Sequence, residues 1–321
     1  MGESPQRTDR VLLAGASGTI GRAVARQLCR TGFEVTCILR RSESGREAAE
    51  ALCELGASIE YADVTDASSL PAGRYDVVIS CLASRTGVPD DARRIDYLAN
   101  RTMLDLASRG GARHFIYLSA ICVQKPELAF QFEKLKFEAD LQASGLTYSI
   151  VRPTAFFKSL SGQVARVRAG KPFLLFGNGE ATACKPISDA DLARYIVDCI
   201  GDESRQDAIL PIGGPGPAIT PLDQGRMLFE LVGREPSFRR IPFRLMDMIV
   251  GTLALAGRLS KRIAAKAEYA RIGRYYARES MLVWDAARGV YDADLTPEIG
   301  HDTLADHYRE MLAAMADRSA S

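Results

Sequence analysis

Three glycines near the start of the chain constrain its fold more than any other feature. Gly15, Gly18 and Gly21 follow an apolar run at residues 11–14 and precede an amphipathic stretch at residues 22–31. A glycine-rich turn between a strand and a helix lets the backbone approach a pyrophosphate, which then lies at the positive end of the helix. The pattern predicts a dinucleotide-binding strand–turn–helix, with contacts from Gly15, Ser17, Gly18, Thr19, Ile20 and Gly21.

Apolar runs and amphipathic stretches alternate through the first half of the chain. Continuous apolar strands separated by helices are typical of a parallel sheet that helices cover on both faces. We therefore predict an α/β fold with a doubly wound parallel sheet of the Rossmann type. Besides the first unit, the predicted strands are residues 34–39, 58–61, 77–80, 114–119 and 147–151, and the predicted helices are residues 47–56 and 94–110.

The second half of the chain has a more mixed pattern. Ser188-Asp-Ala-Asp191 and Thr220-Pro221-Leu-Asp223 are typical helix starts, because a capping Ser or Thr stands three residues before an Asp. The apolar run at residues 208–212 predicts a strand, and its return to the main sheet is left open. Residues 242–277 are expected to be helical.

The change of pattern predicts two domains. We expect a cofactor-binding domain at residues 1–155 and a smaller, mixed substrate domain at residues 156–321. Residues 1–10 are polar and have no apolar presequence-like segment, and residues 314–321 are expected to be frayed.

Two arginines end the second predicted strand. An NAD site usually has an acidic residue at this point, whereas this chain has Arg40 and Arg41. A guanidinium pairs with a 2′-phosphate that a carboxylate would repel, so the two arginines favour NADP(H) over NAD(H). The alternative is that both arginines are solvated surface residues without a ligand. Arg22 would add a further cation. Residues after the third and fourth strands are expected near the adenine and the middle of the cofactor: Asp63, Val64, Leu82 and Ala83.

Composition and charge argue against several classes of protein. The chain has 41 Lys and Arg against 40 Asp and Glu, so its charge does not favour nucleic acid as a partner. Its seven cysteines include no Cys-x-x-Cys pair, which argues against a zinc site or a disulfide framework and favours a reducing compartment. The most apolar stretch, residues 246–257, is only about half a bilayer span. We expect a cytoplasmic protein without a metal or a transmembrane segment.

The segment after the fifth predicted strand contains the candidate catalytic residues. The glycine spacing resembles that of extended or atypical short-chain dehydrogenases, which use Ser or Thr followed by Tyr-x-x-x-Lys. Ser119 and Lys134 match two of these positions and Glu138 follows one turn later, but Phe130 stands where the tyrosine should be. Because phenylalanine cannot transfer a proton, we do not expect carbonyl reduction or alcohol oxidation by the tyrosine mechanism.

Five strings narrow this resemblance to one family. In these strings, and over about residues 10–308, the chain resembles the NADPH-dependent divinyl chlorophyllide 8-vinyl reductases, which are NmrA-like atypical short-chain dehydrogenases. The resemblance implies that NADPH reduces the 8-vinyl group of a divinyl tetrapyrrole to ethyl in chlorophyll or bacteriochlorophyll biosynthesis. Plant members carry a chloroplast presequence, so the polar start of this chain suggests a bacterial member. The strings are SCLASRTG (residues 80–87), LSAICVQKP (118–126), TYSIVRPTAFFKS (147–159), ACKPIS (183–188) and GRYYA (273–277).

The implied reaction accounts for the phenylalanine. Hydride delivered to the outer vinyl carbon leaves a charge that the macrocycle spreads, and protonation of the inner carbon completes the reduction without an alkoxide. Lys134 is expected to bind the nicotinamide ribose and to contribute positive charge, with Ser119 nearby. The proton donor is left open between water and four side chains: Cys122, Lys125, Tyr97 and Lys136.

The substrate pocket is expected to be broad and apolar, with a few cations. Phe156 or Phe157 would stack on the macrocycle, with core packing as an equal alternative for both. Lys158 or Lys185 would pair with a propionate. Residues 246–257 are expected to form a buried helix, and a cover over the pocket or contact with a membrane surface are the alternatives.

Two other functions stay open as alternatives. The first is a non-catalytic NADP(H)-binding sensor or assembly factor, which the missing tyrosine favours and the retained Lys134 and the five strings oppose. The second is a nucleotide-sugar epimerase or dehydratase, which would need the tyrosine.

Overall fold

A seven-stranded parallel sheet forms the centre of the molecule. The computed structural model describes residues 9–257 and 260–320, so most of the polar start expected at residues 1–10 lies outside the described residues. The strand order is β3-β2-β1-β4-β5-β6-β8, and every neighbouring pair is parallel. The predicted α/β fold with a doubly wound parallel sheet is therefore confirmed. The strands are β1 (Arg10–Ala14), β2 (Glu34–Leu39), β3 (Ser58–Tyr61), β4 (Val77–Ser80), β5 (His114–Leu118), β6 (Thr147–Pro153) and β8 (Ala208–Ile212).

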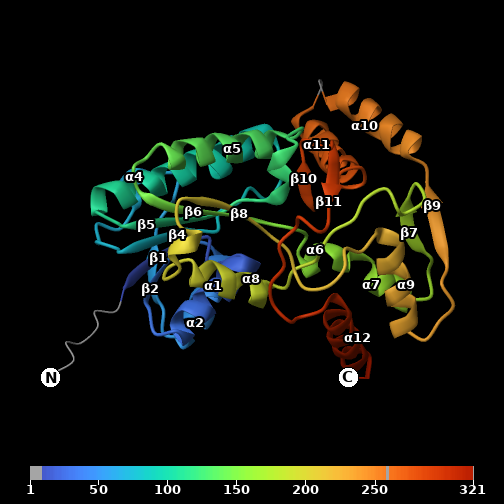
Figure 1. Ribbon diagram of the computed structural model, residues 1–321, viewed down its shortest axis with the longest axis horizontal. Coiled ribbons are helices and arrows are strands. Elements are labelled where there is room, and N and C mark those ends of the chain that lie inside the picture. Colours follow the sequence, from blue (N-terminus) through green and yellow to red (C-terminus); the bar gives the residue numbers. More distant parts are fainter. Residues whose placement is uncertain (1–8, 258–259, 321) are drawn as a thin grey trace.

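Helices cover both faces of this sheet (Figure 1). One face carries α1 (Thr19–Arg30), α2 (Glu43–Glu54) and α8 (Asp189–Asp198), and the other carries α4 (Asn100–Gly110) and α5 (Ala129–Gln142). Strands that are buried on both faces need continuous apolar runs, which is the pattern by which the sequence predicts them.

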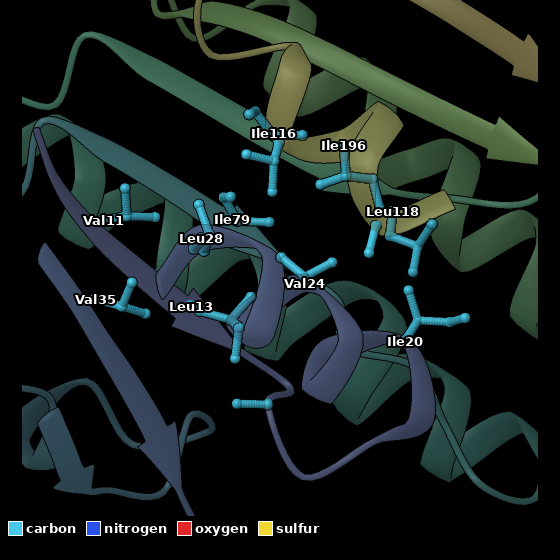
Figure 2. Close-up of a cluster of buried hydrophobic side chains, with 14 of the residues drawn as sticks. Val11, Leu13, Ile20, Val24, Leu28, Val35, Ile79, Ile116, Leu118 and Ile196 are labelled. Atoms are coloured by element: carbon cyan, nitrogen blue, oxygen red, sulfur yellow. The ribbon is translucent and has the colours of Figure 1, made fainter. Parts of the chain in front are cut away.

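The alternation of side chains along β1 divides the core between the two faces. Val11 and Leu13 pack in the cluster under α1 and α8, whereas Leu12 and Ala14 pack in the cluster under α4 and α5. Figure 2 shows the first cluster, in which Leu28 of α1 points toward the strands. The two clusters fix the carboxyl ends of the strands, where the candidate site lies.

The helix predicted at residues 94–110 is interrupted. The chain forms α3 (Pro89–Ala92), then a π-helical turn at Arg93–Ala99, and then α4. The side-chain amide of Asn100 donates to the carbonyl oxygens of Ile95 and Asp96, at 3.1 Å each, so acceptors in the wider turn are satisfied. Short 3-10 turns occur at Ala67–Ser69, Ile121–Gln124, Ser161–Gln163 and Glu203–Arg205.

The chain leaves the main sheet after β6 and returns to it as β8, beside β6. On the way it forms α6 (Phe157–Leu160), α7 (Val164–Arg168), β7 (Phe173–Phe176) and α8. Residues 208–212 therefore do return to the main sheet, a point that the sequence leaves open. Through β8, the second half of the chain contributes a strand to the sheet that the first half forms.

Both predicted helix starts in the second half are confirmed. At the start of α8, Ser188 Oγ accepts a hydrogen bond from the Asp191 backbone N at 2.9 Å. Thr220 and Asp223 form a reciprocal capping box at the start of α9 (Pro221–Leu231), with Pro221 at the first helical position. Near α9, β7 pairs in parallel with β9 (Phe238–Ile241).

Three helices and a hairpin complete the chain. The region predicted as helical at residues 242–277 contains two helices, α10 (Phe243–Gly257) and α11 (Lys261–Tyr276). A hairpin of β10 (Val283–Asp285) and β11 (Val290–Asp292) follows, and then α12 (Leu304–Ala320). The expectation of a frayed end is wrong for residues 314–320, because α12 continues to Ala320 and Met315 packs against the apolar cluster that includes Leu228 and Tyr308. Ser321 lies outside the described residues.

Candidate active site

Two cavities meet beyond the carboxyl ends of the strands. The larger, of about 730 Å³, extends across the ends of β1 to β5. The smaller, of about 340 Å³, lies between the ends of β5 and β6 and the second half of the chain. Phe156 and Ser159 line both cavities. Ligands of doubly wound sheets bind at this edge, so both cavities are candidate binding sites.

The glycine loop has the close contacts that a dinucleotide site needs. Gly15 has a φ of +84°, and a Cβ on it would lie 2.6 Å from the carbonyl oxygen of Cys81. A Cβ on Gly21 would lie 2.2 Å from the carbonyl oxygen of Gly15. Gly18 begins α1 without a side-chain cap, which leaves backbone N–H groups of the first turn facing the larger cavity.

Eleven of the residues predicted to contact the cofactor line the larger cavity. Three predicted cations do not line it: Arg22, Arg41 and Lys134, whose surroundings are described below. Arg22 Nε donates to the carbonyl oxygen of Ser17 at 3.1 Å, and the Arg41 guanidinium lies 5.4 Å from the centre of the Tyr61 ring. The eleven lining residues are Gly15, Ser17, Gly18, Thr19, Ile20, Gly21, Arg40, Asp63, Val64, Leu82 and Ala83.

Several charged groups of the larger cavity are absent from the sequence-based prediction of a cofactor site. Arg85, Arg94 and Asp189 line it, and so does Lys158, which the sequence assigns to the substrate. The Lys158 ammonium donates to Thr19 Oγ1 at 2.8 Å, directly at the glycine loop. Burial raises the pKa of the Asp189 carboxyl. Since Lys158 and Asp189 come from the second half of the chain, both halves form this cavity.

The predicted lysine of the catalytic segment is buried beside an acid. Lys134 is 4% exposed, and its ammonium lies 3.3 Å from Asp96 Oδ1 and 3.3 Å from Tyr117 Oη. Burial lowers the pKa of Lys134, but Tyr117 and Asp96 together raise it by more, so the lysine is charged at neutral pH. Lys134 lines neither cavity, although its charge acts on Cys81 and Cys122, which line one cavity each.

Ser119 belongs to a buried polar network. Its hydroxyl donates to Glu138, and Arg152 binds the same carboxylate. Ser119 lines neither cavity. Phe130, in the place of the tyrosine, packs against an apolar cluster that includes Cys122.

The smaller cavity is mainly apolar and has two proton-bearing groups side by side. Cys122 Sγ lies 3.7 Å from the Tyr276 hydroxyl at the end of α11. Burial raises the pKa of the Cys122 thiol; Tyr276 is 42% exposed as a residue, but its hydroxyl lies against Cys122, and desolvation there raises its pKa as well. Both groups are therefore protonated at neutral pH. Tyr276 is absent from the sequence-based candidates. Its signal is the string at residues 273–277, but only the fold shows that this string reaches the cavity.

The other candidates for proton donation bind elsewhere. The Lys125 ammonium lies 2.7 Å from a Glu279 carboxylate oxygen and 4.4 Å from the Trp284 ring centre. The Tyr97 hydroxyl donates to Asp140 at 2.9 Å, and the Lys136 ammonium lies over the Tyr97 ring. Lys125, Tyr97 and Lys136 line neither of the two cavities described above.

Two of the residues predicted to bind substrate need revision. Phe157 is buried in an apolar cluster and its ring centre lies 5.5 Å from that of His307. Lys185 is buried, with its ammonium 3.0 Å from Glu298 and 3.3 Å from the Thr296 carbonyl oxygen. Because existing contacts satisfy both side chains, we do not retain them at the substrate site. Phe156 does line both cavities.

Over residues 9–257 and 260–320, no group of His, Cys, Asp and Glu side chains is arranged to hold a metal ion. In the same ranges, no helix combines the length and the apolar character needed to span a membrane.

The chain is similar to several known proteins. Residues 15–203 match the family described as NAD(P)H-binding. A curated protein of Arabidopsis thaliana, named divinyl chlorophyllide a 8-vinyl-reductase, chloroplastic, is 46% identical over 94% of this chain and 76% of its own length. The photosystem II assembly factor Ycf39 of Guillardia theta is 25% identical, over 79% of this chain and 81% of its own length.

A solved structure supports the fold alone. The NADPH-dependent quinone oxidoreductase of Escherichia coli, in complex with NADPH, superimposes with a TM-score of 0.66 over 94% of this chain and 99% of its own, at 17% identity.

Proposed function

We propose that this chain, which belongs to the divinyl chlorophyllide a 8-vinyl-reductase family, uses NADPH to reduce the 8-vinyl group of a divinyl tetrapyrrole to an ethyl group. The observation that carries the proposal is the wall formed by Phe156 and Ser159, which is common to the two cavities. A dinucleotide in the larger cavity would thus face an apolar substrate in the smaller one. The smaller cavity suits the vinyl-bearing edge of a macrocycle rather than the whole ring.

The residues of the larger cavity fit NADPH. The close approaches at Gly15 and Gly21 and the uncapped start of α1 suit the pyrophosphate. We assign the 2′-phosphate to Arg40, which lines the cavity at the end of β2. When bound, NADPH supplies the hydride for the reduction. We propose residues 1–155 as the cofactor-binding domain and residues 156–321 as the substrate domain. Lys158 of the second domain contacts Thr19 of the first and lines the cofactor cavity.

The groups of the smaller cavity suit the protonation step. Hydride addition to the outer vinyl carbon leaves a carbanion that the macrocycle stabilises, and a proton on the inner carbon then gives the ethyl group. Cys122 and Tyr276 line this cavity with a thiol and a hydroxyl 3.7 Å apart, and we propose that the proton comes from this pair. No alkoxide forms, so the position of Phe130 needs no tyrosine. We propose that Lys134 contributes a fixed positive charge, held by Asp96.

A peripheral membrane location is part of the proposal. Divinyl tetrapyrroles combine a large apolar macrocycle with a propionate, so they favour the membrane surface, and an enzyme that acts on them gains access to them there. The Arabidopsis relative is named as chloroplastic.

A direct assay tests the proposed reaction. The purified chain is incubated with NADPH and 3,8-divinyl chlorophyllide, and the absorption spectrum and NADPH oxidation are followed together. We expect a blue shift of the pigment bands and one NADPH consumed for each monovinyl product. A chain that binds NADPH but causes no shift and no oxidation would instead be a non-catalytic NADP(H)-binding protein, the alternative that Phe130 favours.

A further inference from the structure

Helix α10 presents an apolar face to solvent. Leu245, Met248, Ile249 and Leu255 are 41%, 60%, 44% and 65% exposed. At about 100° per residue, these four side chains and Thr252 lie on one side of the helix. The earlier expectation of a buried helix at residues 246–257 is therefore wrong for this side of α10.

The opposite side of α10 makes its contacts with the rest of the molecule. Val250 is buried, and Asp247 binds Arg274 at 3.5 Å and Arg278 at 2.7 Å. The Arg278 guanidinium also lies 5.4 Å from the centre of the Phe243 ring. Figure 1 shows α10 along the outer edge of the molecule, beside α11. The apolar face is thus directed away from the protein by specific contacts on the other side.

Positive charge is concentrated around this helix. Residues 238–278 contain ten Lys and Arg and two Asp and Glu, whereas the rest of the chain has 31 basic and 38 acidic residues. Both acids are paired, Asp247 as described and Glu268 with Arg271 at 3.2 Å. Within the part of the chain that the structure describes, five exposed cations of this region have no ion-pair partner: Arg239, Arg240, Arg244, Arg262 and Lys266.

We propose that α10 and the cations around it form a docking surface for an anionic lipid bilayer, with α10 lying in the plane of the interface. An exposed apolar helical face, with unpaired cations on the helix and on the elements before and after it, is typical of interfacial helices. The charge segregation favours an anionic surface over a neutral one, since each cation near such a surface adds to the attraction. The 15 residues of α10 extend over about 22 Å, which suits a helix that lies on a membrane.

This docking surface would bring the smaller cavity close to the membrane. Tyr276, the last residue of α11, lines that cavity, and α11 packs against α10. A pigment dissolved in the lipid would therefore have a short path to the cavity. The docking itself does not depend on the reaction, so its test needs no substrate.

Vesicle sedimentation of the full chain tests the proposal. We expect the protein to sediment with vesicles of phosphatidylcholine and phosphatidylglycerol at low ionic strength, and much less with phosphatidylcholine alone. Exchanging Arg239, Arg240 and Arg244 together for Gln should lower the partition coefficient about a hundredfold. The double variant Met248→Ser with Ile249→Ser should lower it at least about tenfold at unchanged charge.

Matched controls show whether the effect belongs to this surface. Exchanging the exposed Arg26, Arg30 and Arg46 of α1 and α2 for Gln removes the same charge elsewhere, and should leave binding within about twofold of wild type. Circular dichroism and thermal melting of each variant report whether it is folded.

Three results would overturn the proposal. The first is no sedimentation of the wild type with anionic vesicles. The second is an equal loss in the α1 and α2 control. The third is a wild-type dimer that Met248→Ser with Ile249→Ser converts to a monomer while vesicle binding is unchanged, which would assign the face to a second copy of the chain.

Discussion

At the end of β2, two adjacent arginines lie in different surroundings. Arg40 lines the larger cavity, whereas Arg41 stacks on Tyr61. We expect Arg40→Ser to weaken NADPH binding by about 1.5–3 kcal/mol, roughly tenfold to a hundredfold, through loss of the charge-assisted bond to the 2′-phosphate, and to change NADH binding little. Calorimetric titration with each cofactor measures this. Arg41→Ser serves as the neighbouring control, and equal losses for NADPH and NADH in Arg40→Ser would contradict the assignment.

The proposed proton transfer depends on the side chains of Tyr276 and Cys122. Tyr276→Phe should lower kcat by about a hundredfold to ten-thousandfold if its hydroxyl donates the proton, with NADPH affinity unchanged, because Tyr276 lines only the smaller cavity. Cys122→Ala tests the thiol in the same way. The measurement is the rate of monovinyl product, and its solvent isotope effect in heavy water reports whether proton transfer limits the rate.

A neighbouring tyrosine provides the control for this experiment. The Tyr275 hydroxyl donates to the backbone carbonyl oxygens of Cys122 and Lys125, at 2.9 Å each, and does not line the cavity. Tyr275→Phe should therefore affect stability and leave kcat close to that of wild type. Wild-type kcat in both Tyr276→Phe and Cys122→Ala would show that the proton comes from another source.

The residues that could be predicted from the sequence are those whose environment is local. Gly15 and Gly21 serve a turn within seven residues, and Ser188 caps the helix that follows it, so neighbouring residues suffice to identify them. Lys158 at the glycine loop and Tyr276 beside Cys122 depend on contacts between residues more than a hundred positions apart. No local pattern predicts such contacts.

Among the elements, the strands were more predictable than the helices. β2 and β4 match the predicted bounds because a continuous apolar run defines a strand buried on both faces. The π-helical turn at Arg93–Ala99 has no local sequence signature, so the predicted helix at residues 94–110 missed it. That turn positions Asp96 beside Lys134, and the local charge of the candidate site therefore depends on an element that the sequence did not reveal.

The pairing of β5 with β6 is expected to depend on pH. His114 of β5 lies 2.9 Å from Ser149 of β6, and burial, aided by Arg113, lowers the pKa of this histidine to about 4. Because the unfolded chain binds the proton more readily, stability is full above about pH 6.5 and is lost as the pH falls toward 4. The loss from this group should be about 2–3 kcal/mol at pH 4.5.

Carboxylates also titrate in this pH range, so a variant without the His114 imidazole is needed to measure the contribution of this histidine to the loss of stability. His114→Gln removes the titration, so urea unfolding at pH 7 and pH 4.5 should show a smaller decrease for the variant than for wild type. An equal decrease in the two proteins would contradict the role of His114.

At the scale of the whole molecule, residues on both sides of the domain boundary proposed at residue 155 build the main sheet and the larger cavity. β8 pairs with β6, and Ile196 of α8 packs in the core of the sheet. A fragment of residues 1–155 would expose the edge of β6 and an apolar face of the sheet, so we expect it to aggregate or to lack cooperative unfolding. Circular dichroism during urea unfolding checks this against the full chain. A fragment that unfolds cooperatively and binds NADPH would contradict it.

The return of the chain as β8 also determines the order of events during synthesis. When the ribosome has made the glycine loop and the first six strands of the sequence, the sheet still lacks β8, and Lys158 and Asp189 have not yet reached the larger cavity. The nascent first half therefore lacks two of the charged groups that line this cavity, and we expect it to gain little stability from the dinucleotide. The seventh strand is added only when residue 212 has emerged, so folding and cofactor capture should occur together and late.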